Sequence, residues 1–86
     1  MIITDQNNIA AAMQQFRPRL DGAFPTGRAL PGQWEQANCQ EWSETGTIHG
    51  KPAKVYYLFE NRECESEDAS DYPFDAAHVS RIEIDA

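Results

Sequence analysis

Residues 41–59 read EWSETGTIHGKPAKVYYLF, and this stretch decides the fold. Two β-prone runs flank the turn-forming sequence HGKP at 49–52, an arrangement typical of a β-hairpin. Successive side chains of a strand point to opposite faces, so the length of the turn sets which residues share a face. With an even-length turn, one face collects the apolar side chains Trp42, Ile48, Ala53, Val55, Tyr57 and Phe59. We therefore predict a hairpin at about 41–59, with Lys54 and Tyr56 on the opposite face.

Two residues of this hairpin conflict with their expected surroundings. Glu44 falls on the apolar face, where a carboxylate is costly unless it lies near the rim or is paired. Pro52 has no amide proton to donate, so we expect it in the turn or at an edge of the sheet. A three-residue turn would move the apolar residues of the second strand to the face that carries two threonines, and we reject it for that reason.

An N-terminal helix is predicted at about 5–17. Four apolar residues recur at helical spacing, namely Ile9, Met13, Phe16 and Leu20. Thr4 or Asp5 can accept hydrogen bonds from the first free amides. Pro18 removes an amide and disfavours helical backbone at the residue before it, which ends the helix near Arg17. We expect the apolar side of this helix to pack on the apolar face of the hairpin.

The rest of the chain divides into two polar stretches and a last strand. Glycines and prolines interrupt any period at 21–33, which predicts a loop. The stretch at 60–71 is polar without a hydrophobic period and predicts an exposed acidic loop. Residues 79–84 predict a last strand. The 86 residues suit a single domain, 1–86, of the α+β class: one N-terminal helix packed on a small antiparallel sheet built around the hairpin.

The chain is acidic, and its charge is unevenly distributed. The net charge is −7, and residues 33–86 alone carry −8. An acidic surface repels phosphate and anionic lipid, which disfavours direct nucleic-acid or membrane binding. A basic partner protein, or no charged partner at all, is compatible with this charge. No apolar run reaches the roughly 18 to 20 residues of a membrane span, and the first residues lack the pattern of a secretion signal. We expect a cytoplasmic protein with Cys39 and Cys64 as free thiols.

The sequence contains no strong motif for catalysis, a metal or a cofactor. His49, His78, Cys39 and Cys64 are residue types that bind zinc, but no pair has a short ligand spacing. Ser43, His49 and an acid contain the atoms of a catalytic triad without a nucleophile elbow or an oxyanion-hole sequence. A phosphate-binding glycine loop is missing as well. We therefore expect no enzymatic activity, no cofactor and no metal site.

The acidic run at 60–71 is the main functional candidate. Its acidic residues are Glu60, Glu63, Glu65, Glu67, Asp68 and Asp71. In an extended chain the three glutamates at alternate positions would lie on one side, about 6.6 to 6.8 Å apart, like successive phosphates of a nucleic-acid strand. We predict a non-catalytic protein-binding module, an inhibitor that presents a nucleic-acid-like surface to a basic, nucleic-acid-binding partner. The alternatives are a run that only maintains solubility, a structural or homo-oligomeric domain, and, third, a small-molecule enzyme.

Overall fold

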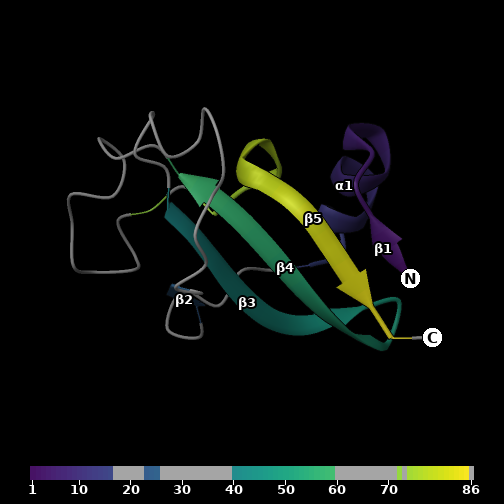
Figure 1. Ribbon diagram of the computed structural model, residues 1–86. Coiled ribbons are helices and arrows are strands. Elements are labelled where there is room, and N and C mark those ends of the chain that lie inside the picture. The colour runs from purple at the N-terminus through teal and green to yellow at the C-terminus, as the bar shows by residue number, and fades with distance from the viewer. Residues whose placement is uncertain (17–22, 26–39, 60–71, 73, 86) are drawn as a thin grey trace.

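The computed structural model describes residues 1–16, 23–25, 40–59, 72 and 74–85. In this part of the chain, antiparallel strands form one sheet in the order β1-β5-β4-β3-β2. The strands are β1 (Ile2–Ile3), β2 (Ala23–Pro25), β3 (Gln40–Ile48), β4 (Lys51–Phe59) and β5 (Val79–Ile84). The helices are α1 (Gln6–Met13) and a short 3₁₀ helix (Ala76–His78). Figure 1 shows α1 next to β1 and β5, beside the long β3–β4 hairpin. These elements place the fold in the α+β class.

The turn between β3 and β4 consists of two residues, His49 and Gly50. The Cα partners run from Ile48 and Lys51 beside the turn to Gln40 and Phe59 at the open end. Both turn residues have positive φ, 53° at His49 and 73° at Gly50. This combination is that of a type I′ turn, which follows the right-handed twist of the two strands. Because the turn is even in length, the apolar side chains of β3 and β4 share one face.

Pro52 lies within β4, opposite Thr47, and β4 is a central strand of the sheet. The prediction of a turn or edge position was therefore wrong. The pair next to the closing pair of a two-residue hairpin exchanges no backbone hydrogen bonds, so β3 needs no amide from Pro52. On the other side, the Pro52 carbonyl accepts a hydrogen bond from the Asp85 amide at 2.9 Å, just beyond the end of β5. Pro52 therefore lacks an amide proton at a point where β5 has already ended and needs no donor.

The buried core lies between α1 and one face of the sheet. Its members are Ile9, Ala12, Phe16, Ala23, Trp42, Ile48, Ala53, Val55, Tyr57, Phe59, Tyr72, Phe74, Val79, Ile82 and Ile84. Met13 is partly buried and packs against this set. Full burial of a large apolar side chain contributes about 1.5 to 3 kcal/mol, so these contacts are the main source of stability in so small a fold. Within the described ranges, no helix is long and apolar enough to cross a membrane.

A β-bulge lets both ends of β5 contribute to the core. Strict alternation would put Val79 on the face opposite Ile82 and Ile84. The pairing with β4 steps from Arg81 directly to Val79, so Ser80 is the extra residue of a bulge. The Ser80 hydroxyl donates a hydrogen bond to a carbonyl of β4 at 3.3 Å. The bulge restores Val79 to the buried face.

The helix α1 is shorter than the helix predicted at 5–17, because it ends at Met13. Gln14 still has helical backbone angles, and the Gln15 amide donates to the Ala12 carbonyl at 3.0 Å, so α1 ends in a tighter last turn. A Cβ atom placed on Gly46 would lie 2.5 Å from the Cε2 atom of Phe16, so the Phe16 ring that follows this turn packs directly on the backbone of β3.

Two short strands form the edges of the sheet. β2 lies inside the stretch 21–33 that the sequence predicts as a loop, and it pairs with residues 42–44 of β3. A three-residue strand is too short to show alternation, which is why the prediction was wrong there. Pro25 is tolerated because β2 is an edge strand. At the opposite edge, β1 pairs with β5 through Ile2 and Ile3.

Candidate functional site

The acidic residues predicted to bind a partner lie outside the described part of the chain. They are Glu60, Glu63, Glu65, Glu67, Asp68 and Asp71. Cys39 and Cys64 also lie outside it. The structure does place the two residues that flank the acidic run, Phe59 at the end of β4 and Tyr72.

Phe59 and Tyr72 are both buried, and their rings stack on each other. The ring centroids are 5.5 Å apart and the planes are inclined by 23°. Phe59 has no exposed surface and Tyr72 is 6% exposed. The acidic run at 60–71 is therefore attached at both ends to neighbouring points of the same core.

Phe74 completes an aromatic cluster around Phe59. We define the aromatic cluster as Trp42, Tyr57, Phe59, Tyr72 and Phe74. The Phe74 ring meets Phe59 edge-on at 5.1 Å and Tyr57 edge-on at 4.8 Å, while Trp42 lies 4.8 Å from Tyr72. Edge-to-face pairs contribute about 0.5 to 1.5 kcal/mol beyond their buried area. The alternation of side chains in the hairpin predicts that Trp42, Tyr57 and Phe59 share the buried face. It does not predict that Tyr72 and Phe74, which follow the acidic run, join them.

His78 lies at the margin of the aromatic cluster. Its ring centroid is 5.2 Å from that of Phe59, and its Nδ1 atom is 3.0 Å from the Oδ1 atom of Asp75. The same Asp75 oxygen accepts a hydrogen bond from the Ala77 amide and so caps the 3₁₀ helix. Among the described residues, no group of three or more His, Cys, Asp or Glu side chains could hold a metal ion.

A buried carboxylate lies on the same face as the aromatic cluster, and one member of the cluster carries a buried phenol. Glu44 lies on the core face of β3 and is only 1% exposed. It is therefore buried in the core and not at its rim, where a charge would be least costly. Burial raises the pKa of the Tyr57 phenol well above its ordinary value, and the charges of Glu44 and Asp75 raise this pKa further. The phenol therefore stays protonated. Within the described residues, its Oη atom has no hydrogen-bond partner.

The outer face of the sheet carries a second tyrosine in a different setting. The guanidinium carbon of Arg81 lies 4.0 Å from the centre of the Tyr56 ring, and Lys54 Nζ lies 5.4 Å from it. The Tyr56 hydroxyl donates a hydrogen bond to Glu83 at 3.1 Å, and Arg81 Nε is 3.8 Å from the same carboxylate. Lys54 and Arg81 thus both lie over the Tyr56 ring, and Arg81 also lies beside the Glu83 carboxylate.

The contrast between the two tyrosines leads to a prediction about stability. We expect Tyr57→Phe to raise the free energy of unfolding by about 1 kcal/mol, because it removes a buried hydroxyl that lacks a partner among the described residues. Tyr56→Phe is the matched control. It removes a hydroxyl that does donate, to Glu83, and should lower the same free energy by about 0.5 to 1.5 kcal/mol. Urea unfolding at neutral pH measures both, and a loss of stability in Tyr57→Phe would contradict this account.

The same substitution should change how stability depends on pH. The folded-state pKa of Tyr57 is raised, so above about pH 10 the unfolded chain releases a proton that the folded chain keeps. Stability of the wild type should therefore fall as pH rises through that value. Tyr57→Phe should remove this part of the loss, and the gap between the two proteins should widen above pH 10 in alkaline urea series. A constant gap would show that the phenol ionises equally in both states.

Comparison of the chain with protein-family models, with curated proteins and with solved structures found no match.

Proposed function

We propose that this protein is a non-catalytic binding module whose acidic run at 60–71 contacts a basic surface of a partner protein. The observation that carries the proposal is charge: the run holds six acidic residues and one arginine, within a region of net charge −8. A run without an apolar period has little surface to bury, so the contact rests on electrostatic attraction. The favoured partner is a nucleic-acid-binding protein, whose own site is built to attract phosphates. The protein then acts as an inhibitor that competes with nucleic acid.

The way the run is attached supports this proposal. Phe59 and Tyr72, which flank it, are buried and stacked in the core. Fixing both ends of a segment on folding removes part of the conformational entropy that binding must otherwise overcome. An acidic segment tied down at both ends is therefore a better binding element than a free acidic tail.

The partner is found by affinity capture from lysate at low and high salt, since a charge-driven partner is lost at high salt. Binding to that partner is then compared with a variant that removes four charges of the run: Glu63→Gln, Glu65→Gln, Glu67→Gln and Asp68→Asn. We expect the variant to bind at least about tenfold more weakly at low salt, with most of the loss in the association rate. The difference should shrink as salt is added, because exposed charges are screened within about 8 Å at physiological ionic strength.

A charge-retaining variant separates charge from side-chain shape. Aspartate at the three glutamate positions and Glu at position 68 keep the net charge of the run and should bind within about threefold of wild type. The sequence predicts an exposed run, so we expect both variants to fold normally, because surface substitutions usually change stability by less than about 0.5 kcal/mol each. If the neutralised variant binds as tightly as wild type and with the same salt dependence, the run only maintains solubility.

Competition tests the inhibitory part of the proposal. Nucleic acid bound to the captured partner should be displaced by the wild-type protein and not by the neutralised variant. Simultaneous binding of the protein and nucleic acid would show that the acidic run occupies another surface. A mass of the free protein that rises with its concentration would instead favour a homo-oligomeric domain.

A further inference from the structure

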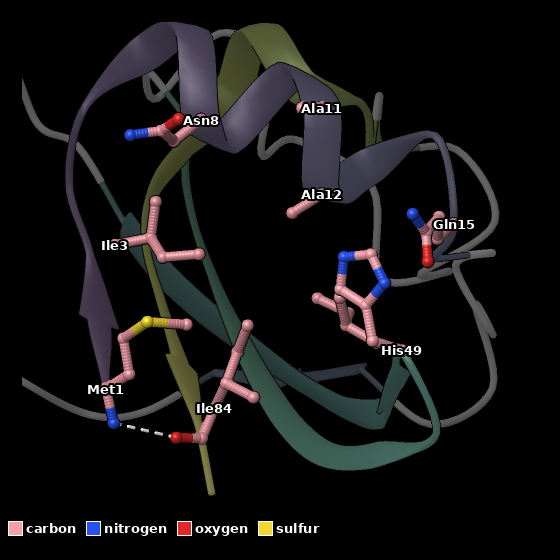
Figure 2. Close-up of a pocket in the computed structure, with 9 residues that line it drawn as sticks. Met1, Ile3, Asn8, Ala11, Ala12, Gln15, His49 and Ile84 are labelled. Carbon is pink, nitrogen blue, oxygen red and sulfur yellow. Dashed lines mark hydrogen bonds between the residues drawn. The ribbon is translucent and has the colours of Figure 1, made fainter. Parts of the chain in front are cut away.

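A cavity of about 430 Å³ lies between α1 and the end of the sheet where β1, β5 and the hairpin turn meet (Figure 2). Pockets that bind small molecules usually measure about 300 to 1,000 Å³, so this cavity suits a small ligand. Its lining includes neither Phe59 nor Tyr72, the two residues that flank the acidic run. Its use is therefore independent of the function proposed above.

The floor of the cavity is apolar and held in place by the sheet. Ile48 and Ile84 line it and are 1% and 5% exposed over the whole residue. Ile3 lines it from β1. The strand β1 is fixed by two backbone hydrogen bonds, in which the Met1 amino group donates to the Ile84 carbonyl and the Ile84 amide donates to the Met1 carbonyl, each at 2.8 Å. The floor is thus preformed, which reduces the cost of binding.

Small side chains on α1 leave the space open. Ala11 and Ala12 line the cavity from the helix, where a larger apolar residue would fill it. Ala12 is buried and faces the floor, whereas Ala11 is exposed. Figure 2 shows both alanines on the helix above the apolar floor.

The rim of the cavity is polar and consists of Asn8, Gln15 and His49. All three residues are exposed. The side-chain amides of Asn8 and Gln15 and the ring nitrogens of His49 supply hydrogen-bond donors and acceptors. The lining residues in the described part of the chain include no Lys, Arg, Asp or Glu. The Met1 amino group is directed to the Ile84 carbonyl in Figure 2.

The backbone of His49 adds a second observation at the rim. His49 has a φ of 53° at the first position of the type I′ turn, where Asn, Asp or Gly is preferred. A non-glycine residue with positive φ is uncommon and costs conformational energy. In Figure 2 its ring stands at the edge of the cavity, facing Ala12 and Gln15. The turn thus places an imidazole at the edge of the cavity, at a position where asparagine would adopt the same backbone conformation more readily.

We propose that this cavity binds a small molecule with an apolar body and one polar edge that carries both a hydrogen-bond donor and an acceptor. The apolar body lies against Ile48 and Ile84, and the polar edge bonds to His49 with Asn8 or Gln15. A cationic ligand is disfavoured because no carboxylate lines the site to offset its desolvation, whereas the Met1 amino group does line it. A wholly apolar ligand would leave the polar rim unsatisfied.

The test uses 7-azaindole, a neutral two-ring heterocycle with one donor and one acceptor, and benzylammonium as a cationic probe of similar size. Backbone amide shifts are followed by NMR as each probe is titrated into the full chain. We expect saturable shifts at Ala12, Ile48 and Ile84 with a dissociation constant below about 1 mM for 7-azaindole. Benzylammonium should bind at least about tenfold more weakly. No saturable shift with 7-azaindole, or equal binding of the two probes, would overturn the proposal.

Two variants locate the site. Ala11→Phe should close the mouth of the cavity and weaken 7-azaindole binding at least about tenfold. Ala10→Phe changes an exposed neighbour on α1 that does not line this cavity, and it should leave binding unchanged. Equal binding by Ala11→Phe and wild type would place the ligand elsewhere and overturn the proposal.

A substitution in the turn tests the role of the imidazole without disturbing the helix. His49→Asn keeps a residue that adopts positive φ readily and should fold at least as stably as wild type. It shortens the polar side chain, and we expect about fivefold weaker binding of 7-azaindole, which corresponds to the loss of one hydrogen bond. Unchanged affinity in His49→Asn would refute the assigned contact.

Discussion

Replacing Phe59 with Ala should lower the free energy of unfolding by about 3 to 5 kcal/mol, a large part of the stability of a domain this small. Phe59 has no exposed surface. Its ring contacts Tyr57, Tyr72, Phe74 and His78 at centroid distances between 5.1 and 6.1 Å. The truncation removes the shared member of all these contacts and leaves a void among rigid rings that cannot collapse into it.

Thermal and urea unfolding measure this loss, and Leu58→Ala is the matched control. Leu58 is the neighbouring residue of β4, half-buried on the opposite face. Its truncation should cost clearly less than that of Phe59, because it removes less buried surface. Equal melting of Phe59→Ala and wild type would contradict the position of Phe59 at the centre of the aromatic cluster.

Gly46→Ala should also destabilise the fold, by about 1 to 3 kcal/mol, although alanine usually suits a strand better than glycine does. The added Cβ would lie 2.5 Å from Phe16 Cε2 and 3.2 Å from its Cζ. Phe16 is 4% exposed, so its ring has little room to move away. The steric conflict therefore outweighs the gain in backbone entropy.

A double-mutant cycle tests this mechanism. In a Phe16→Leu background the ring atom nearest to Gly46 is absent, so Gly46→Ala should cost much less there than in wild type. Phe16→Leu alone should be destabilising, because it leaves unfilled space in the core. The same cost of Gly46→Ala in both backgrounds, or a gain in stability, would show that the ring is not what makes glycine necessary at this position.

The buried face of the hairpin could be predicted because it depends only on local alternation. From Ala53 to Phe59 every second residue is apolar and buried, and the parity of a two-residue turn carries the same face to Trp42. The burial of Tyr56 does not follow from that pattern. Tyr56 is 7% exposed on the outer face because Lys54 and Arg81 cover it, and one of these residues belongs to a different strand.

Other features depend on residues that are distant in the sequence. Tyr72 and Phe74 join the core only because β4 brings Phe59 to them. The Phe16 ring packs against Gly46 of β3, a contact that helical periodicity alone does not indicate. The cavity beneath α1 requires the first strand, the helix, the hairpin turn and the last strand together. Local propensities cannot predict these contacts, because each of them forms only when distant segments meet in the assembled sheet.

The pairing of β1 with β5 also limits the order in which the fold can form. The hydrogen bond between Met1 and Ile84 joins residues 83 positions apart, and Figure 1 shows the two ends of the chain side by side. During synthesis on the ribosome, the first strand emerges long before its partner exists. The β2–β3 pair, the β3–β4 hairpin and the helix can form early, while the other edge of the sheet waits for residues 79–84. A pairing between residues this far apart in the sequence slows folding. Until residue 84 has been made, Ile2 and Ile3 have no strand to pair with, and a stalled nascent chain would expose them to chaperones.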